Sequence, residues 1–244
     1  MEKYAVPVED MSFILTNLLD IDNYFKSINN KELSFDSLKM IIEEAGKFAC
    51  DELDKINQVG DQEGIKLENG VVRMPESFIK AYKKFVNTGW FSIIGEKKYG
   101  GQDLPLSAVV MINEIWHSTN MSFATNNMLT QGAVELLESH GNEKQKEYYL
   151  PNLISGKWSG TMNLTEPHAG SDLSSIKTKA IEKDKKFLIK GTKIYITHGD
   201  QDMSDNIIHL VLAKLPNAPE GVRGISLFLV PKYYLNDKKT KVKN

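Results

Sequence analysis

The stretch Met162-Asn163-Leu164-Thr165-Glu166-Pro167-His168-Ala169-Gly170-Ser171-Asp172 decides the fold prediction for this sequence of 244 residues. Its first part alternates apolar and polar residues, which is the period-two pattern of a β-strand. A proline, a glycine, a serine and an aspartate follow, and these residue types favour a sharp turn. The pattern therefore predicts a strand that ends in a turn-rich loop. Two interpretations stay open at this point: a plain structural transition, or a segment whose backbone amides and Thr165 hydroxyl bind a planar, heteroatom-rich edge.

Upstream of this stretch, apolar residues recur every three or four positions, which predicts amphipathic helices. The longest such pattern runs from Ser34, a candidate N-cap, to Gly60, which favours a helix end. Asn142 and Gln145 are spaced as in a capping box, which predicts the start of a later helix. Residues 60–72 are expected to form a polar loop. The further helices are expected near 75–89, 107–117, 123–140 and 142–149.

Near Gly156 the spacing of apolar residues changes from every three or four positions to every second position, in short runs that predict β-strands. Helices followed by strands indicate two segregated domains. We therefore expect an α+β fold, with an all-α domain over 1–157, including an extension at 1–33, and an antiparallel β domain over 158–244. The candidate strands cover 158–164, 176–181, 187–190, 193–197, 206–215 and 224–230.

Composition excludes several classes of protein. A formal net charge of −2 and 41% hydrophobic residues argue against disorder and against a nucleic-acid footprint. No run approaches the roughly 18 apolar residues of a membrane span, and residues 1–15 lack a signal-peptide core, so a cytoplasmic location is expected. The single cysteine, Cys50, is predicted to be a buried structural thiol. The five histidines show no metal-ligand spacing, so no metal site is expected.

The string Leu-Thr-Glu-Pro-x-Ala-Gly-Ser-Asp, here Leu164 to Asp172, resembles the signature of the acyl-CoA dehydrogenase family of flavoenzymes. The run Gly191 to Thr197 is similar to that family's next flavin-contacting strand, and its separation from Thr165 also suits the family. The run Tyr4 to Met11 is similar to an extended subgroup that includes 3-methylmercaptopropionyl-CoA dehydrogenase-like proteins. Further similarities lie at 99–101, 141–156 and 224–231.

The resemblance implies non-covalently bound FAD and oxidation of an acyl-CoA thioester to the 2,3-enoyl-CoA, with the flavin supplying the redox step. Tyr195 takes the place of an aromatic residue, often tryptophan, on the isoalloxazine face, and tyrosine keeps a flat apolar surface. Thr197 would donate toward flavin N5 or O4, and Ser171 would also contact the pantetheine or phosphate side of the substrate. The implied cofactor contacts are Met162, Asn163, Leu164, Thr165, Ser171, Tyr195, Ile196 and Thr197.

The resemblance also implies parts that this sequence lacks. The family's middle β-barrel has strands beyond Pro231, and its C-terminal four-helix domain carries the catalytic glutamate in this branch. No acid in this sequence matches that glutamate, so we expect an incomplete barrel and no catalytic residue in this chain. The family's usual partners are an acyl-CoA substrate, an electron-transfer flavoprotein as acceptor, and further copies of the same subunit.

Three functions therefore stay open. The chain is an N-terminal fragment of an acyl-CoA dehydrogenase of fatty acid metabolism, inactive alone, or one half of a split enzyme that a second chain completes. The third alternative is a non-catalytic module that binds acyl-CoA or a partner protein through the same fold. None of the three involves a nucleic acid or a membrane span.

Overall fold

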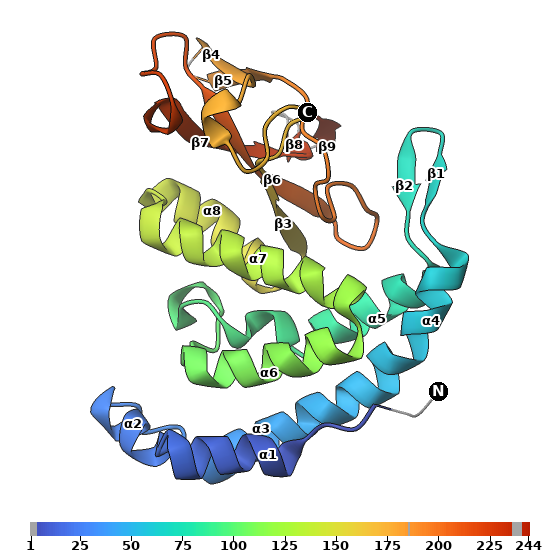
Figure 1. Ribbon diagram of the computed structural model, residues 1–244, viewed down its shortest axis with the longest axis vertical. Helices are drawn as coiled ribbons and strands as arrows, with labels where there is room; N and C mark the ends of the chain where they lie inside the picture. Colours follow the sequence, from blue (N-terminus) through green and yellow to red (C-terminus); the bar gives the residue numbers. More distant parts are fainter. Residues whose placement is uncertain (1–3, 185, 236–240) are drawn as a thin grey trace.

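The computed structural model describes residues 4–184, 186–235 and 241–244. Helices precede the main sheet along the chain, as the sequence predicts (Figure 1). The extension predicted at 1–33 forms α1 (Val8–Phe13), a π-helical turn (Ile14–Leu18) and α2 (Ile21–Ser27), with residues 1–3 outside the described part. Its buried side chains join the helical core. These are Met11, Leu15, Ile21 and Phe25.

The helix predicted from Ser34 to Gly60 is confirmed, but it does not end at Gly60. It consists of α3 (Phe35–Phe48), a π-helical turn (Ala49–Leu53) and α4 (Asp54–Glu63), and the Ser34 hydroxyl caps its start. Gly60 is a packing residue, because a Cβ there would lie 2.2 Å from the ring of Phe78. The helix ends at Gly64, whose φ of +62° suits glycine.

Four further helices confirm the pattern-based prediction, and the predicted capping box joins Asn142 and Gln145 reciprocally. Two 3-10 turns (Trp90–Ile93 and Lys97–Tyr99) lie between the first two of these helices. Among the described residues no helix is both long and apolar enough to cross a membrane. The four helices are α5 (Glu76–Asn87), α6 (Leu106–Thr119), α7 (Met121–His140) and α8 (Glu143–Ile154).

Two local expectations are wrong. The polar loop predicted at 60–72 contains a hairpin of β1 (Lys66–Glu68) and β2 (Val71–Arg73). Its turn, Asn69-Gly70, has positive φ at both residues, which is what a tight hairpin turn requires. Cys50 is half-buried rather than buried, and its Sγ donates to the carbonyl oxygen of Tyr4 at 3.2 Å.

The main sheet is mixed rather than antiparallel throughout. The predicted antiparallel pairing is correct for β4 with β5 and for β6 with β7, whereas β3 and β4 each pair with β6 in parallel. A separate antiparallel pair, β8 (Tyr233–Leu235) with β9 (Lys241–Lys243), follows it. The domain boundary between residues 157 and 158 stays our proposal. The sheet strands are β3 (Trp158–Asn163), β4 (Lys179–Lys183), β5 (Lys186–Lys190), β6 (Asn206–Lys214) and β7 (Ile225–Pro231).

Helix α7 joins the two parts, since it packs on α6 and on β3 (Figure 1). The close approach depends on Gly160, because a Cβ there would lie 2.5 Å from the Cβ of Ala133. The Gly160 amide also donates to the Thr130 hydroxyl of α7 at 3.1 Å. Strand β3 is therefore fixed directly on a helix.

Gly160→Val is expected to lower the free energy of unfolding by about 1–3 kcal/mol, because the added atoms overpack the contact of α7 with β3. The matched control is Gly132→Ala on α7, the helix that packs on Gly160, because a Cβ at Gly132 would meet nothing within 4 Å. Helix propensity predicts that this control raises stability by about 0.5–1 kcal/mol. Urea unfolding followed by circular dichroism measures both values. Equal effects of the two substitutions would contradict the packing role of Gly160.

Candidate functional site

The two segments that the sequence analysis singles out, 162–165 and 193–197, lie side by side. The backbone N–H of Ile194 donates to the carbonyl oxygen of Thr165 at 3.0 Å. Lys193 reaches the same segment, because its Nζ donates to the carbonyl oxygen of Leu164 at 2.9 Å. The structure thus brings together two segments that lie far apart in the sequence.

Glu166 fixes the loop that follows the first segment. The residue is only 3% exposed. Oε1 accepts from Lys193 Nζ at 2.9 Å and from the Thr178 amide at 3.1 Å, and Oε2 accepts from the Lys177 amide at 2.8 Å. Each carboxylate oxygen therefore has a donor, and one of these donors carries the opposite charge.

The pKa of Glu166 reflects these contacts. Burial by itself raises the pKa, but Thr178, Lys193 and the amides of Lys177 and Thr178 together lower it to about 2. The carboxylate is therefore charged at neutral pH and pairs with Lys193. Sequence analysis missed both residues as site-building groups, because neither belongs to a local pattern for an ion pair and only the fold brings them together.

Tyr195 is the most unusual residue of the site. Its side chain is 89% exposed and its φ is +56°. A bulky residue at positive φ is strained, and such strain persists where the surrounding structure imposes it, often at binding sites. The strand predicted at 193–197 is therefore wrong, because the chain turns after the single hydrogen bond of Ile194 with Thr165.

Of the other site residues predicted from the sequence, Thr197 and Ser171 are exposed, and the rest are half-buried. Thr197 is exposed next to Tyr195, and the half-buried Ile196 accepts from the Gly199 amide at 2.9 Å. Ser171 is exposed in the next loop, and among the described residues it makes no hydrogen bond to either segment. The first segment is half-buried at all four positions, Met162, Asn163, Leu164 and Thr165.

The chain that follows Tyr195 is fixed to α7. His198 Nε2 lies 2.9 Å from the carbonyl oxygen of Ser122, in the first turn of that helix. Because a carbonyl oxygen only accepts, Nε2 carries the hydrogen. Burial lowers the pKa of His198, so it is neutral at pH 7.

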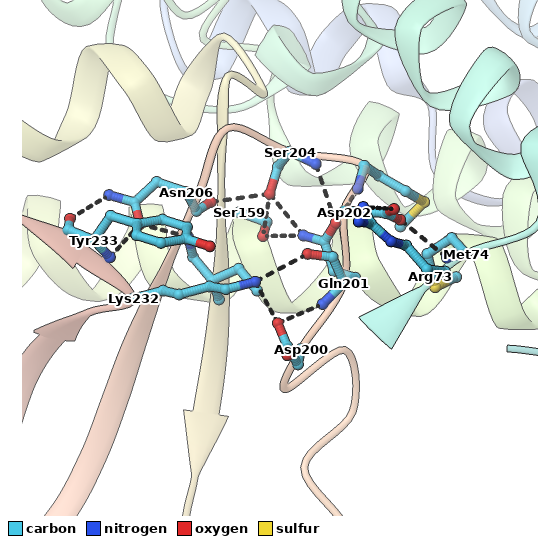
Figure 2. A network of polar contacts seen from close by, with 12 residues as sticks. Arg73, Met74, Ser159, Asp200, Gln201, Asp202, Ser204, Asn206, Lys232 and Tyr233 are labelled. Atoms are coloured by element: carbon cyan, nitrogen blue, oxygen red, sulfur yellow. Dashed lines mark hydrogen bonds and ion pairs between the residues drawn. The ribbon is translucent and has the colours of Figure 1, made fainter. Parts of the chain in front are cut away.

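Figure 2 shows how a polar network holds the loop from Asp200 to Ser204. Gln201 is 1% exposed, and its Nε2 donates to the hydroxyls of Ser159 at 3.0 Å and Ser204 at 2.6 Å. The side-chain oxygen of Gln201 accepts from the backbone amides of Met203 and Ser204. The loop is therefore anchored on β3 through a fully buried amide.

Two charged contacts extend this network to other elements (Figure 2). Asp202 accepts from the Met74 amide at 2.9 Å and pairs with Arg73 of β2 at 3.2 Å. Asp200 pairs with Lys232, just after β7. The β1–β2 hairpin and the end of β7 thus brace the loop that follows Tyr195 and Thr197.

The arrangement suits a flat organic group with a polar edge. Among the residues that the structure describes, no group of three or more histidine, cysteine, aspartate and glutamate side chains could hold a metal ion. The exposed aromatic residue Tyr195 follows Ile194, whose backbone is hydrogen-bonded to Thr165, and it precedes the exposed Thr197 by two positions. A flat ring with heteroatoms at its edge could stack and hydrogen-bond there at the same time.

Two family patterns and a curated relative match this chain. The pattern described as "Acyl-CoA dehydrogenase, N-terminal domain" matches residues 36–157, and "Acyl-CoA dehydrogenase, middle domain" matches residues 161–242. A 3-methylmercaptopropionyl-CoA dehydrogenase of Ruegeria pomeroyi is 44% identical over 230 residues, which cover 94% of this chain and 39% of that protein.

Solved structures show the same similarity. An acyl-CoA dehydrogenase from Geobacillus kaustophilus has a TM-score of 0.68 and 28% identity, over 82% of this chain and 49% of that one. The FAD complex of PigA has a TM-score of 0.65 and 27% identity, over 82% of this chain and 49% of that one. The chain spans about two fifths of the length of the curated relatives it matches.

Proposed function

The chain belongs to the acyl-CoA dehydrogenase family, and from that membership we propose that it forms the flavin-binding part of an FAD-dependent acyl-CoA dehydrogenase. The reaction is the α,β-dehydrogenation of an acyl-CoA thioester. When bound, FAD supplies the redox chemistry, and the protein supplies position and electrostatics. The observation that carries the proposal is Tyr195, an exposed aromatic residue in a strained backbone conformation beside fixed polar backbone.

We assign the residues of the two segments to the parts of a flavin according to their chemistry. Tyr195 is assigned to the flat face of the ring, where an aromatic ring contributes apolar contact area. The backbone amides of Leu164 and Thr165 and the hydroxyls of Thr165 and Thr197 are assigned to its polar edge. The remaining assigned contacts are Met162, Asn163 and Ile196, with Ser171 toward the pantetheine or phosphate groups.

We assign the Glu166–Lys193 ion pair no part in the reaction. Glu166 is fully hydrogen-bonded and buried, so it cannot reach a substrate proton, and it acts by holding the two segments together. We assign no catalytic base to this chain. A carboxylate that accepts the α-proton of the thioester would come from a further segment or from a second chain.

The partners follow from the family. The substrate is an acyl-CoA thioester, and the electron acceptor is an electron-transfer flavoprotein. The relative named for 3-methylmercaptopropionyl-CoA matches 94% of this chain, which favours a short acyl group. Assembly with further copies, or with a chain that supplies the remaining part, would complete the enzyme.

Titration of the purified chain with FAD tests the proposal. We expect quenched flavin fluorescence and a shifted flavin absorbance band, because the flavin ring moves out of water and packs against the aromatic ring of Tyr195. An acyl-CoA alone is not expected to bleach the flavin, because no base is assigned here. A folded chain, confirmed by circular dichroism, that leaves both flavin signals unchanged would overturn the flavin assignment. Binding of acyl-CoA in calorimetry without FAD binding would favour the non-catalytic module instead.

A further inference from the structure

A row of three polar side chains joins β6 to the first segment, 162–165. The three residues are His209, Thr161 and Asn163. In the parallel pairing of β3 with β6, Thr161 lies opposite His209. The Thr161 hydroxyl lies 2.8 Å from His209 Nδ1 and 2.8 Å from Asn163 Oδ1. Thr161 is fully buried, so these two neighbours account for its polar atom. The row therefore joins β6 to Asn163, a residue that the proposed function counts among the flavin contacts.

The direction of these hydrogen bonds follows from the number of hydrogens. A threonine hydroxyl has a single hydrogen to donate, and an amide oxygen only accepts. Thr161 therefore donates to Asn163 Oδ1 and accepts from His209. His209 then carries a hydrogen on Nδ1, and its hydrogen bond sets the orientation of the hydroxyl. Among the described residues, no group accepts from Asn163 Nδ2, which is left as a donor.

We propose that His209 is a positioning residue of the flavin site, which acts through Thr161 to hold Asn163 with its Nδ2 donor available to a ring-carbonyl oxygen of the ligand. This inference rests on the proposed function, because it needs a ligand with an acceptor at its edge. No sequence motif contains His209. Its role follows from its register opposite Thr161 and from the two hydrogen bonds of that hydroxyl.

The charge state of His209 does not alter this arrangement. Burial lowers its pKa, the Asp200 carboxylate raises it, and Lys232 lowers it, with a lowered value as the net result. His209 is therefore neutral at pH 7. Nδ1 carries a hydrogen both in the required neutral tautomer and in the protonated ring. The hydrogen bond to Thr161 is thus kept on either side of the titration.

The tautomer is directly measurable. In the chain labelled with ¹⁵N-histidine, long-range ¹H–¹⁵N spectra at pH 7.5 are expected to show His209 protonated on Nδ1. Thr161→Val removes the acceptor, and His209 is then expected to change to the Nε2-protonated form that predominates in water. His140, exposed at the end of α7, serves as the reference signal. A wild-type His209 protonated on Nε2 would overturn the proposed direction of the hydrogen bonds.

FAD affinity tests the positioning role. We expect Asn163→Leu, Thr161→Val and His209→Leu each to weaken FAD binding by about five- to tenfold, as for one hydrogen bond. The double variant His209→Leu/Thr161→Val is expected to be no weaker than either single variant, because both act through the same hydrogen bond. His209→Asn, which keeps a donor near Nδ1, is expected to retain most of the affinity, and His140→Leu is the matched control.

The outcomes separate the two proposals. A wild-type chain that binds no FAD would refute the proposed function, and the positioning role would fail with it, although the tautomer is still measured. FAD binding that is unchanged in the folded His209→Leu variant would refute the positioning role alone. Equal losses in His209→Asn and His209→Leu, with additive losses in the double variant, would indicate general damage to the sheet and would also overturn it.

Discussion

Lys193→Met is expected to lower the free energy of unfolding by about 3–5 kcal/mol, because it leaves the Glu166 carboxylate buried without its cation. The exposed fraction of the side chain is 9% for Lys193 and 2% for Glu166, so water cannot replace the lost partner. Two backbone amides still bind the carboxylate, which keeps the effect below that of a fully isolated charge. Urea unfolding at pH 7 measures the change.

The matched control is Lys80→Met, which removes the cation of an exposed pair. Lys80 and Glu76 lie 3.7 Å apart on α5, and both side chains are about 70% exposed. Such a pair contributes little in water, so little change is expected. A similar small effect of Lys193→Met would show that the ion pair with Glu166 does not hold the two segments together.

The same pair predicts a pH dependence. The pKa of Glu166 is about 2 in the folded chain, against an ordinary value of 4.5. A carboxyl group with a lowered pKa contributes stability above pH 4.5, and this contribution is lost as the pH falls toward 2. The expected loss is about 3 kcal/mol at 1.36 kcal/mol per pH unit.

Comparison with a variant isolates this contribution from the other acids. The double variant Glu166→Gln/Lys193→Met lacks the titrating pair, so its unfolding free energy should fall less steeply between pH 5 and pH 2.5. The informative quantity is the difference between wild type and double variant at each pH. A constant difference over this range would mean that Glu166 keeps an ordinary pKa in the folded chain.

The helices could be predicted because their signals are local. The capping pairs at Ser34 and at Asn142 with Gln145, together with the spacing of apolar residues, contain the information within one or two turns. Where prediction fails, a longer-range contact decides. Gly60 reads as a helix stop from the sequence, yet it lies inside α4, where the ring of Phe78 packs against it.

The sheet shows the same limit. Parallel pairing of β3 with β6 joins Trp158 to Asn206 across a long connection, and no local pattern distinguishes it from an antiparallel hairpin. The run Ile194-Tyr195-Ile196-Thr197 has the composition of a strand, but among the described residues no second row of hydrogen bonds forms along it. Composition gives the propensity, and the available neighbours decide whether a strand forms.

For the proposed site, the resemblance selects two segments that the structure brings side by side, but not the groups that hold them. Leu164 and Thr165 do contact Lys193 and Ile194, as adjacent segments must. The Glu166 ion pair, the buried amide of Gln201 and the row through His209 depend on residues that meet only in the folded chain. These supporting residues have ordinary local sequences, so only the structure identifies them.

Tyr195→Gly is expected to weaken FAD binding by about tenfold or more while leaving the chain equally stable or slightly more stable. The loss of affinity follows because the substitution removes the aromatic surface assigned to the flavin face. The stability should not fall, because the 89% exposed ring packs on little of the chain. Glycine also removes the strain of the φ of +56°, which stabilises the folded chain by about 1–2 kcal/mol. The greater conformational entropy of glycine in the unfolded chain offsets about 0.5–1 kcal/mol of this gain.

Two further variants separate the ring from the backbone. Tyr195→Trp keeps a flat apolar surface and is expected to bind FAD about as tightly as the wild type. Asp103→Gly relieves a similar φ of +55° far from either flavin segment in the sequence, so it should leave FAD affinity unchanged. Fluorescence titration and urea unfolding on the same samples give both quantities. Unaltered FAD affinity in Tyr195→Gly would mean that this ring does not hold the flavin, and its exposure would then point to a different ligand or to a covering protein surface.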